Sequence, residues 1–151
     1  IFLSKSAEMV VRWYKLWDEL EGISKRVLVE VGPNSPFLAG PLQVGRYDLL
    51  LVAPATGNTV AKIVHGIADS LVSNCVAQAQ KGGIPVYILP SYQEERPIVT
   101  TPLPTGEKLQ ITMREVDLEN TRRLRKMKGV RVLASPDEIA TAINDLERAR
   151  G

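Results

Sequence analysis

The chain has 151 residues, of which 44% are hydrophobic and 24% charged, and its formal net charge at pH 7 is +2. This length and balance suit one globular domain with a substantial core, and the small net charge excludes the large basic surface that nucleic-acid binding needs. The single cysteine, Cys75, excludes an intrachain disulfide and fits a reducing cytoplasm, and the apolar runs are too short to cross a membrane.

The amino-terminal part of the chain predicts a strand followed by a helix. Residues 1–3 resemble the end of a buried strand, after which Ser4 or Ser6 can cap a helix. Apolar side chains then recur at helical spacing over residues 7–20, and Gly22 ends the helix.

A second strand and the clearest strand of the chain follow. Residues 26–31 (RVLVEV) predict a short strand, and the proline- and glycine-rich residues 32–41 predict a loop or a broken helix. The apolar run over residues 47–53 (YDLLLVA), stopped by Pro54, is typical of a central parallel strand that is covered on both faces.

The middle of the chain predicts a parallel α/β unit. Residues 54–58 form a turn, and a helix over residues 59–65 is interrupted at residues 66–69. A second helix covers residues 70–80, and residues 84–89 (IPVYIL) predict another buried strand. Strand, helix and strand in this order indicate parallel strands joined by a right-handed crossover.

The last third of the chain changes character. Residues 98–103 and 108–116 alternate in polarity as in a hairpin. A short basic helix is expected over residues 117–128 and a brief strand over residues 130–133. Ser135, as N-cap, then begins a closing helix that covers residues 139–149.

Three segments could hold a ligand, because an open parallel sheet binds ligands beyond the carboxyl ends of its strands. Residues 54–59 (PATGNT) lie at such an end, where small residues let a flat ligand approach the backbone. Asp69 could cap the second helix and present its amides, and Ser4 and Ser6 could hold a phosphate. Each segment has a plainer alternative, namely a strand-to-helix turn or simple helix capping.

Other reactive side chains give weaker signals. His65 has no partner histidine or carboxylate cluster, so no metal site is expected, and Cys75 is interpreted as a buried, inert residue. A basic cluster is interpreted as a solvated helix face or as a docking surface for an acidic electron donor such as a ferredoxin. It consists of Arg122, Arg123, Arg125, Lys126 and Lys128.

Two linked motifs carry a family resemblance. Residues 54–59 (PATGNT) and 66–71 (GIADSL) resemble the Pro-Ala-Ser-Ala-Asn-Thr and Gly-Ile-Ala/Cys-Asp-x-Leu hallmarks of the homo-oligomeric flavin-containing cysteine decarboxylase superfamily. The start FLSKSAEMV resembles the second strand of that family and its flavin-contacting serine or threonine. The match is closest to the archaeoflavoprotein and dihydromethanopterin reductase (acceptor) branch.

The resemblance implies a flavodoxin-like, doubly wound parallel sheet in three αβα layers, extended by a hairpin and a carboxyl-terminal helix. Residues 1–151 would then form a single FMN-binding domain that assembles from trimers. The first strand and the phosphate loop of the family are expected upstream of this sequence. Residues 91–116 are expected to form a flap over the flavin or an oligomer contact. The flavin-binding residues that this resemblance implies are Ser4, Ser6, Pro54, Ala55, Thr56, Asn58, Thr59, Ala68 and Asp69.

Departures from the family pattern argue against decarboxylation. Residues 34–38 lack the active-site histidine of the decarboxylases, and residues 90–93 (PSYQ) replace their Pro-x-Met-Asn motif. Gly57 stands where the family usually has alanine.

The expected function is therefore an FMN-dependent oxidoreductase that reduces a pterin such as dihydromethanopterin. The electrons would come from a ferredoxin-like donor or NAD(P)H. No catalytic residue is assigned. The alternatives are a non-enzymatic FMN electron-transfer protein, a decarboxylase or prenyltransferase of the same superfamily, and a structural trimer without flavin.

Overall fold

A three-stranded parallel sheet forms the centre of the molecule. The computed structural model describes residues 1–93 and 98–149, with the backbone alone for residues 98–101. The sheet has the order β3 (Leu50–Ala55), β4 (Val86–Pro90) and β7 (Val130–Val132), with Val86 opposite both Leu50 and Val130. The expected parallel strands are thus confirmed, although β3 begins later than residue 47 and continues through Pro54 to Ala55.

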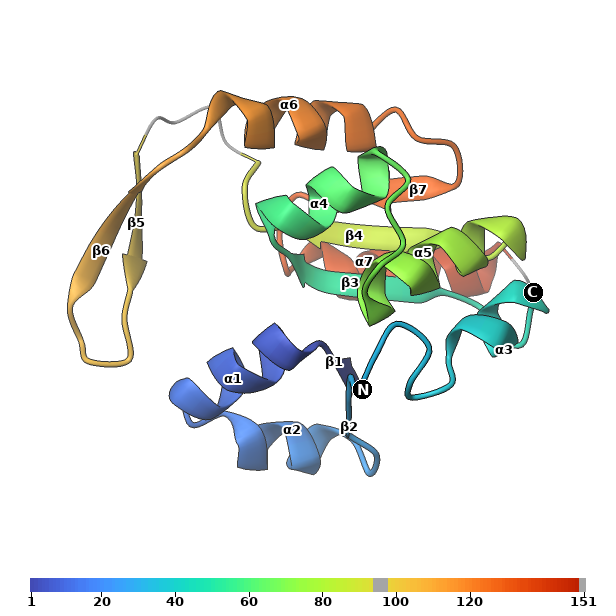
Figure 1. The fold of residues 1–151 in the computed structure, drawn as a ribbon, viewed down its shortest axis with the longest axis horizontal. Helices are drawn as coiled ribbons and strands as arrows, with labels where there is room; N and C mark the ends of the chain where they lie inside the picture. Colours follow the sequence, from blue (N-terminus) through green and yellow to red (C-terminus); the bar gives the residue numbers. More distant parts are fainter. Residues whose placement is uncertain (94–97, 150–151) are drawn as a thin grey trace.

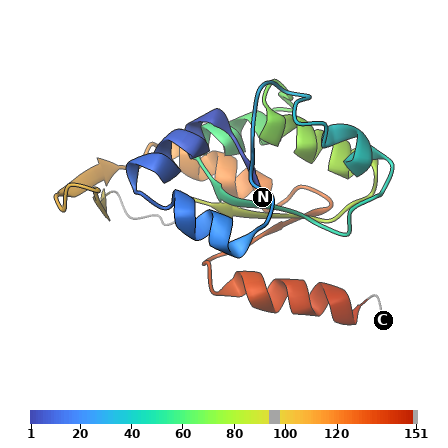
Figure 2. The ribbon, with the colours of Figure 1, turned by 90° about the horizontal axis from the view of Figure 1, so that it is seen from below.

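Helices cover both faces of this sheet. Figure 2 shows α7 (Glu138–Arg148) on one face and α4 (Gly57–Val64) with α5 (Leu71–Lys81) on the other. Side chains along β4 alternate between two clusters, so Val86 and Ile88 pack with α4 and α5 while Tyr87 packs with Ala142 of α7. This alternation is the period-two geometry of a strand, and it produces the three-layer α/β class that we expected.

A second parallel pair lies beside the central sheet. It consists of β1 (Phe2–Leu3) and β2 (Leu28–Val29), which is much shorter than the strand expected over residues 26–31. In the part of the chain that the structure describes, β1 and β2 form a sheet separate from β3. Leu3 is buried, whereas Phe2 is exposed.

The prediction of one continuous helix over residues 7–20 is wrong. Two helices occupy this stretch, α1 (Lys5–Trp13) and α2 (Trp17–Ile23). They are separated at Lys15, whose φ of 59° is the left-handed conformation that cannot continue a right-handed helix. The apolar spacing runs through this break, so periodicity alone could not locate it. Gly22 also lies within α2 rather than ending it.

The hairpin extends away from the sheet (Figure 1). β5 (Ile98–Pro102) pairs antiparallel with β6 (Lys108–Thr112), as expected, but β6 ends four residues before residue 116. The next helix, α6 (Glu115–Leu124), begins earlier and ends earlier than residues 117–128. A hydrogen bond of 2.9 Å from the Tyr14 hydroxyl to the Pro102 carbonyl oxygen ties the end of α1 to the hairpin.

Residues 32–41, expected to form a loop or a broken helix, lead into a short helix, α3 (Ala39–Gln43), which contributes Leu42 to the core. The start of the last helix differs from expectation. The cap of α7 is Asp137 rather than Ser135, and its side chain makes no capping hydrogen bond. Within the described residues, no helix is long and apolar enough to span a membrane.

The buried Cys75 thiol gives a testable consequence of this core. Burial, with a smaller effect from the charge of Glu30, raises the pKa of Cys75 from 9.0 to about 12. We expect no reaction of the native protein with a thiol-specific disulfide reagent at about pH 8, because only the thiolate attacks. The same reagent should label Cys75 fully in denaturant.

The raised pKa of Cys75 also predicts how the free energy of unfolding depends on pH. Between pH 9 and 12 the unfolded thiol loses its proton while the folded one keeps it, so the free energy of unfolding should fall as pH rises through this window. Fast stoichiometric labelling of the native protein would contradict the burial of the thiol. A Cys75→Ser variant whose free energy of unfolding falls with pH as steeply as that of the unmodified protein would contradict the effect on stability.

Candidate functional site

The carboxyl ends of β3 and β4 meet at one edge of the sheet. Parallel pairing requires this, because both strands run in the same direction. The backbone N–H of Ser91, which follows β4, donates to the carbonyl oxygen of Ala55 at 2.8 Å. The segment after β4 therefore lies against the beginning of the PATGNT motif.

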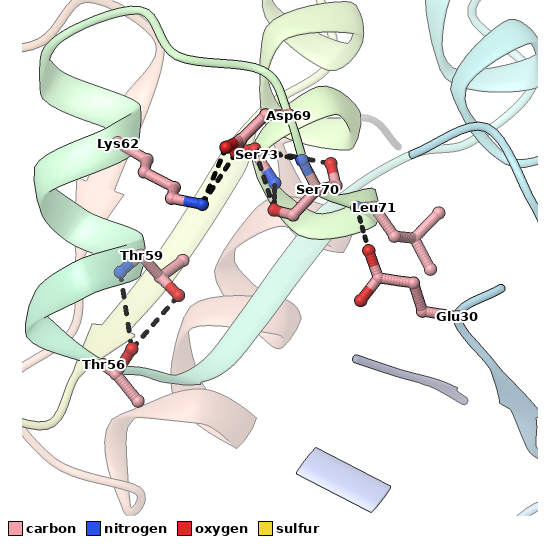
Figure 3. Close-up of polar contacts among 8 residues, drawn as sticks. All are labelled: Glu30, Thr56, Thr59, Lys62, Asp69, Ser70, Leu71 and Ser73. Carbon is pink, nitrogen blue, oxygen red and sulfur yellow. Dashed lines mark hydrogen bonds and ion pairs between the residues drawn. The ribbon is translucent and has the colours of Figure 1, made fainter. Parts of the chain in front are cut away.

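Thr56 begins the helix that follows β3. Its hydroxyl oxygen accepts a hydrogen bond from the Thr59 N–H at 3.4 Å, and the two hydroxyl groups lie 3.2 Å apart (Figure 3). The helix was expected to begin at residue 59, and α4 starts two residues earlier, at Gly57, with Thr56 as its N-cap. The motif thus supplies the first turn of α4, whose amide groups favour anionic or polar ligands.

A cavity of about 410 Å³ opens over this first turn. It falls in the volume range of small-ligand sites, about 300–1,000 Å³. The walls come from three parts of the chain, namely the motif, the segment after β4, and the junction of β6 with α6. The lining residues are Thr56, Gly57, Asn58, Tyr92, Ile111, Thr112, Met113, Arg114 and Asp117.

Arg114 and Asp117 form a paired wall of this cavity. The Arg114 Nε and Nη2 atoms each donate to one Asp117 oxygen at 2.8 Å, which is the bidentate geometry that guanidinium and carboxylate groups favour. Asp117 is only 5% exposed, whereas the Arg114 side chain is largely in solvent. The hydrogen bond that Arg114 donates to Asp117, followed by the negative charge of Asp117, raises the pKa of Arg114.

Gly57 lets this pair approach the motif. A Cβ atom at this position would lie 2.7 Å from Asp117 Oδ1 and 3.2 Å from a ring carbon of Tyr92. The departure from the family's usual alanine therefore has a physical reason in this chain. Gly57 itself is buried, with the Tyr92 ring and the Asp117 carboxylate packed against its backbone.

The second motif, residues 66–71, connects the end of α4 to the start of α5. Asp69 accepts two hydrogen bonds from Lys62 Nζ, at 2.8 and 3.0 Å, and this bond is the largest cause of its lowered pKa (Figure 3). We expected Asp69 to cap α5, but Ser70 does so, in a reciprocal capping box with Ser73. Ala68 is exposed beside this ion pair.

Glu30 joins the two predicted segments that lie far apart in sequence. Its carboxylate accepts a hydrogen bond from the Leu71 N–H at 2.6 Å and another from the Lys5 N–H at 3.2 Å. These amides belong to the first turns of α5 and α1, so one negative charge compensates the positive ends of two helices. Figure 3 shows Glu30 on the opposite side of Ser70 from Lys62.

The predicted ligand residues therefore fall into two groups. Thr56 and Asn58 line the cavity, with Ala55 buried at the end of β3 and Pro54 exposed. Ser4 caps α1 by accepting a bond from the Ala7 N–H, as the alternative interpretation expected, and Ser6 is exposed. Whether any of these residues contacts a flavin stays a prediction.

The sequence did not predict four residues that lie in this region. Glu30, Tyr92, Arg114 and Asp117 lie outside the two motifs, and Arg114 and Asp117 reach the cavity only because the hairpin returns the chain to α4. The position of Tyr92 after a parallel strand was the one usable signal. Among residues 1–93 and 98–149, no group of three or more histidine, cysteine or acidic side chains could hold a metal ion.

The basic cluster is partly neutralised within its own helix. Arg122 pairs with Glu115 at 2.8 Å, and Arg123 pairs with Glu119 at 2.5 Å. Arg125 donates to the Gln93 side chain at 3.1 Å. The solvated-face interpretation agrees with these pairs, and a role in docking a donor stays a prediction.

The fold and site together define an α/β protein with a cavity at the carboxyl edge of an open parallel sheet. The Flavoprotein family model matches residues 1–150, and the chain belongs to this family. The resemblance stated from the two motifs is thereby confirmed.

Three similar proteins show what kinds of protein this chain resembles. A dihydromethanopterin reductase (acceptor) from Methanocaldococcus jannaschii is 32% identical, over 94% of this chain and 81% of its own length. An uncharacterized protein from the same organism is 54% identical, over 95% and 76%. The structure of Burkholderia xenovorans DmrB in complex with FMN, described as a cubic protein cage for redox transfer, is 30% identical with a TM-score of 0.81. The alignment covers 98% of this chain and 80% of DmrB, and it confirms the flavodoxin-like three-layer fold.

The contact at Gly57 predicts the effect of restoring alanine there. Gly57→Ala should lower the free energy of unfolding by about 1 kcal/mol, because the cost of the overlap with Asp117 exceeds the gain from alanine in a helix. Gly22→Ala is the matched control, since nothing lies within 4 Å of a Cβ atom at that helical position. The control should stabilise the protein by roughly 0.5–1 kcal/mol. Urea unfolding of both variants measures the difference, and equal effects would refute the contact.

Proposed function

We propose that the chain is an FMN-dependent oxidoreductase that reduces a pterin such as dihydromethanopterin. The observation that carries this proposal is the cavity over the PATGNT motif, in a chain whose relatives include a dihydromethanopterin reductase (acceptor) and FMN-bound DmrB. Electrons would come from a ferredoxin-like protein or from reduced nicotinamide.

The residues of the cavity fit a flavin. FMN, when bound, supplies the hydride or electron chemistry, and the protein supplies binding and orientation. Asn58 offers amide donors and an acceptor, Thr56 offers a hydroxyl group, and the first turn of α4 offers backbone N–H groups.

The same cavity argues against a cysteine decarboxylase. Residues 34–38 provide no histidine, and the one histidine of the chain, His65, is the exposed C-cap of α4, at the end of the helix away from the cavity. Tyr92 occupies the wall where the decarboxylase motif would contribute its methionine and asparagine. We therefore favour reduction over decarboxylation.

The first experiment is an absorption spectrum of the purified protein, with chromatography of the released chromophore. We expect flavin bands and released FMN, followed by reduction of a dihydropterin when a reduced ferredoxin or NADH is supplied. A colourless protein that also fails to take up added FMN would refute the proposal. Flavin bands with no turnover on any pterin would leave a flavoprotein of another activity.

Asn58 provides the sharper test of where the flavin binds. Asn58 lines the cavity, so Asn58→Ala should weaken FMN binding about tenfold, the expected cost of losing one hydrogen bond to the ligand. Asn144→Ala is the control, because Asn144 is exposed on α7, on the other face of the sheet. Quenching of flavin fluorescence gives both dissociation constants, and an unchanged value for Asn58→Ala would remove this residue from the flavin site.

We also propose that the protein is a homo-oligomer built from trimers, since its relative DmrB is described as a cubic cage. The amphipathic helix α1 supports this proposal, because none of its residues is buried and Met9 and Trp13 are 67% and 54% exposed. Apolar patches of this kind mark protein–protein contacts.

Charge placed on this apolar face should disrupt the assembly. We expect Met9→Glu to shift the protein toward smaller species in light scattering after size-exclusion chromatography, because burying the new carboxylate is unfavourable. Lys25→Glu, at an exposed polar position, should keep the assembly intact. A protein that is monomeric before any substitution would refute the oligomer.

A further inference from the structure

We infer that the β5–β6 hairpin is an arm that packs against a second copy of this chain, and that this contact supports one wall of the cavity. The inference rests on the homo-oligomer proposed above. It adds the surface that the second copy covers and a link between assembly and ligand binding.

The hairpin has one apolar and one polar face. Side chains alternate along a strand, so Leu109 and Ile111 of β6 lie on one face while Lys108 and Gln110 lie on the other. Ile111 is half-buried in the cavity wall, whereas Leu109, farther from α6 on the same face, is 44% exposed. The apolar face of β6 therefore begins at the cavity and continues beyond it to an exposed leucine.

The chain itself gives this hairpin little support. Figure 1 shows β5 and β6 extending away from the sheet, and within the described residues the two strands pack mainly on each other. The hydrogen bond from the Tyr14 hydroxyl to the Pro102 carbonyl oxygen ties them to α1. A two-stranded hairpin is marginally stable in water unless a third strand or another apolar surface packs on it. We therefore assign that surface to a partner.

The exposed face of α1 continues the apolar surface of the hairpin. The Trp13 and Tyr14 rings meet edge to face with centroids 5.6 Å apart, and Tyr14 in turn bonds to the hairpin. Met9 and Trp13 are 67% and 54% exposed, and methionine and aromatic residues are enriched at protein–protein interfaces. The five residues of β6 and the nine of α1 extend about 16 Å and about 13 Å. A surface of this extent suits a protein partner better than a small ligand.

The charges around this surface favour a second copy as the partner. Residues 5–23 and 98–112 hold four basic and five acidic side chains, namely Lys5, Arg12, Lys15 and Lys108 against Glu8, Asp18, Glu19, Glu21 and Glu107. This near balance gives no large field that would select a strongly acidic or basic partner. A second copy brings an equally balanced surface, so the contact buries apolar side chains without a large repulsion between like charges.

The arm also forms part of the cavity. Ile111, Thr112 and Met113, at its base, line the cavity together with Thr56 and Asn58 of the motif. An arm that is held by a second copy keeps this wall in place, whereas a free arm does not. Assembly and flavin binding should therefore strengthen each other, because the coupling between two binding events is reciprocal.

Two neighbouring substitutions on β6 test the arm. Leu109→Glu places a carboxylate on the apolar face, and Gln110→Glu places the same charge on the polar face. We expect Leu109→Glu to shift the protein to smaller species in light scattering after size-exclusion chromatography, because burying an unpaired carboxylate opposes association. Gln110→Glu should keep the mass of the unmodified protein. An unchanged mass for Leu109→Glu, or equal dissociation of both variants, would overturn the inference.

A flavin titration distinguishes a second copy from the chain's own cavity as the surface under the arm. With quenching of FMN fluorescence as the readout, Leu109→Glu should weaken FMN binding about fivefold or more, together with its loss of mass. Gln110→Glu should change neither quantity. Weaker FMN binding at an unchanged mass would mean that the hairpin closes on its own chain, which would also overturn the inference.

Hydrogen exchange of the unmodified protein tests the arm without any substitution. The backbone amides of β5 and β6 should exchange more slowly as the protein concentration rises through the range in which the mass increases, because the contact between copies opposes local opening. Exchange of these amides that does not change over this range would contradict the contact. This measurement remains decisive if Leu109→Glu does not fold.

The outcomes separate this inference from the proposed function. A monomeric protein that binds FMN and reduces a dihydropterin retains the function and loses the arm. A protein that dissociates on Leu109→Glu but takes up no FMN retains the contact between copies and loses the flavin-dependent function.

Discussion

The parallel pairing of β3 with β4 is the constraint on which the site depends. Two strands that run in the same direction must end at the same edge, so the segments that follow them meet there. The bond from the Ser91 N–H to the Ala55 carbonyl oxygen closes this contact, and Thr56 starts α4 at once. Helices α4 and α5 on one side of the sheet and α7 on the other bury both faces of β4, which holds the edge in place.

The hairpin and α6 complete the cavity from the other side. Their contribution depends on a close approach that only glycine permits, since a Cβ atom on Gly57 would collide with Asp117. A carboxylate buried to this degree is costly unless it is paired, and the bidentate contact with Arg114 supplies the pairing. Gly57 leaves room for the Asp117 carboxylate, and Arg114 compensates the charge of that carboxylate.

The amino termini of α1 and α5 share one acidic group. Glu30 accepts bonds from the first turns of both helices, and Asp69 separately pairs with Lys62 beside the start of α5. The Glu30 carboxylate thus occupies amides that could otherwise bind an anion. The cavity at α4 has no such carboxylate bonded to its first turn among the described residues, which makes it the better candidate for a polar ligand.

The sequence by itself determined the α/β class, the two buried strands and the PATGNT turn, because these depend on local runs of apolar residues and on turn chemistry. It also carried the family, through two short motifs at a fixed separation. Only the tertiary structure decided that the first helix breaks at Lys15, that Ser70 rather than Asp69 caps α5, and that Arg114 and Asp117 face the motif. The physical reason is distance along the chain. Residues 57 and 117 meet only through the hairpin and the packing of α6 on α4, and no local pattern encodes that contact.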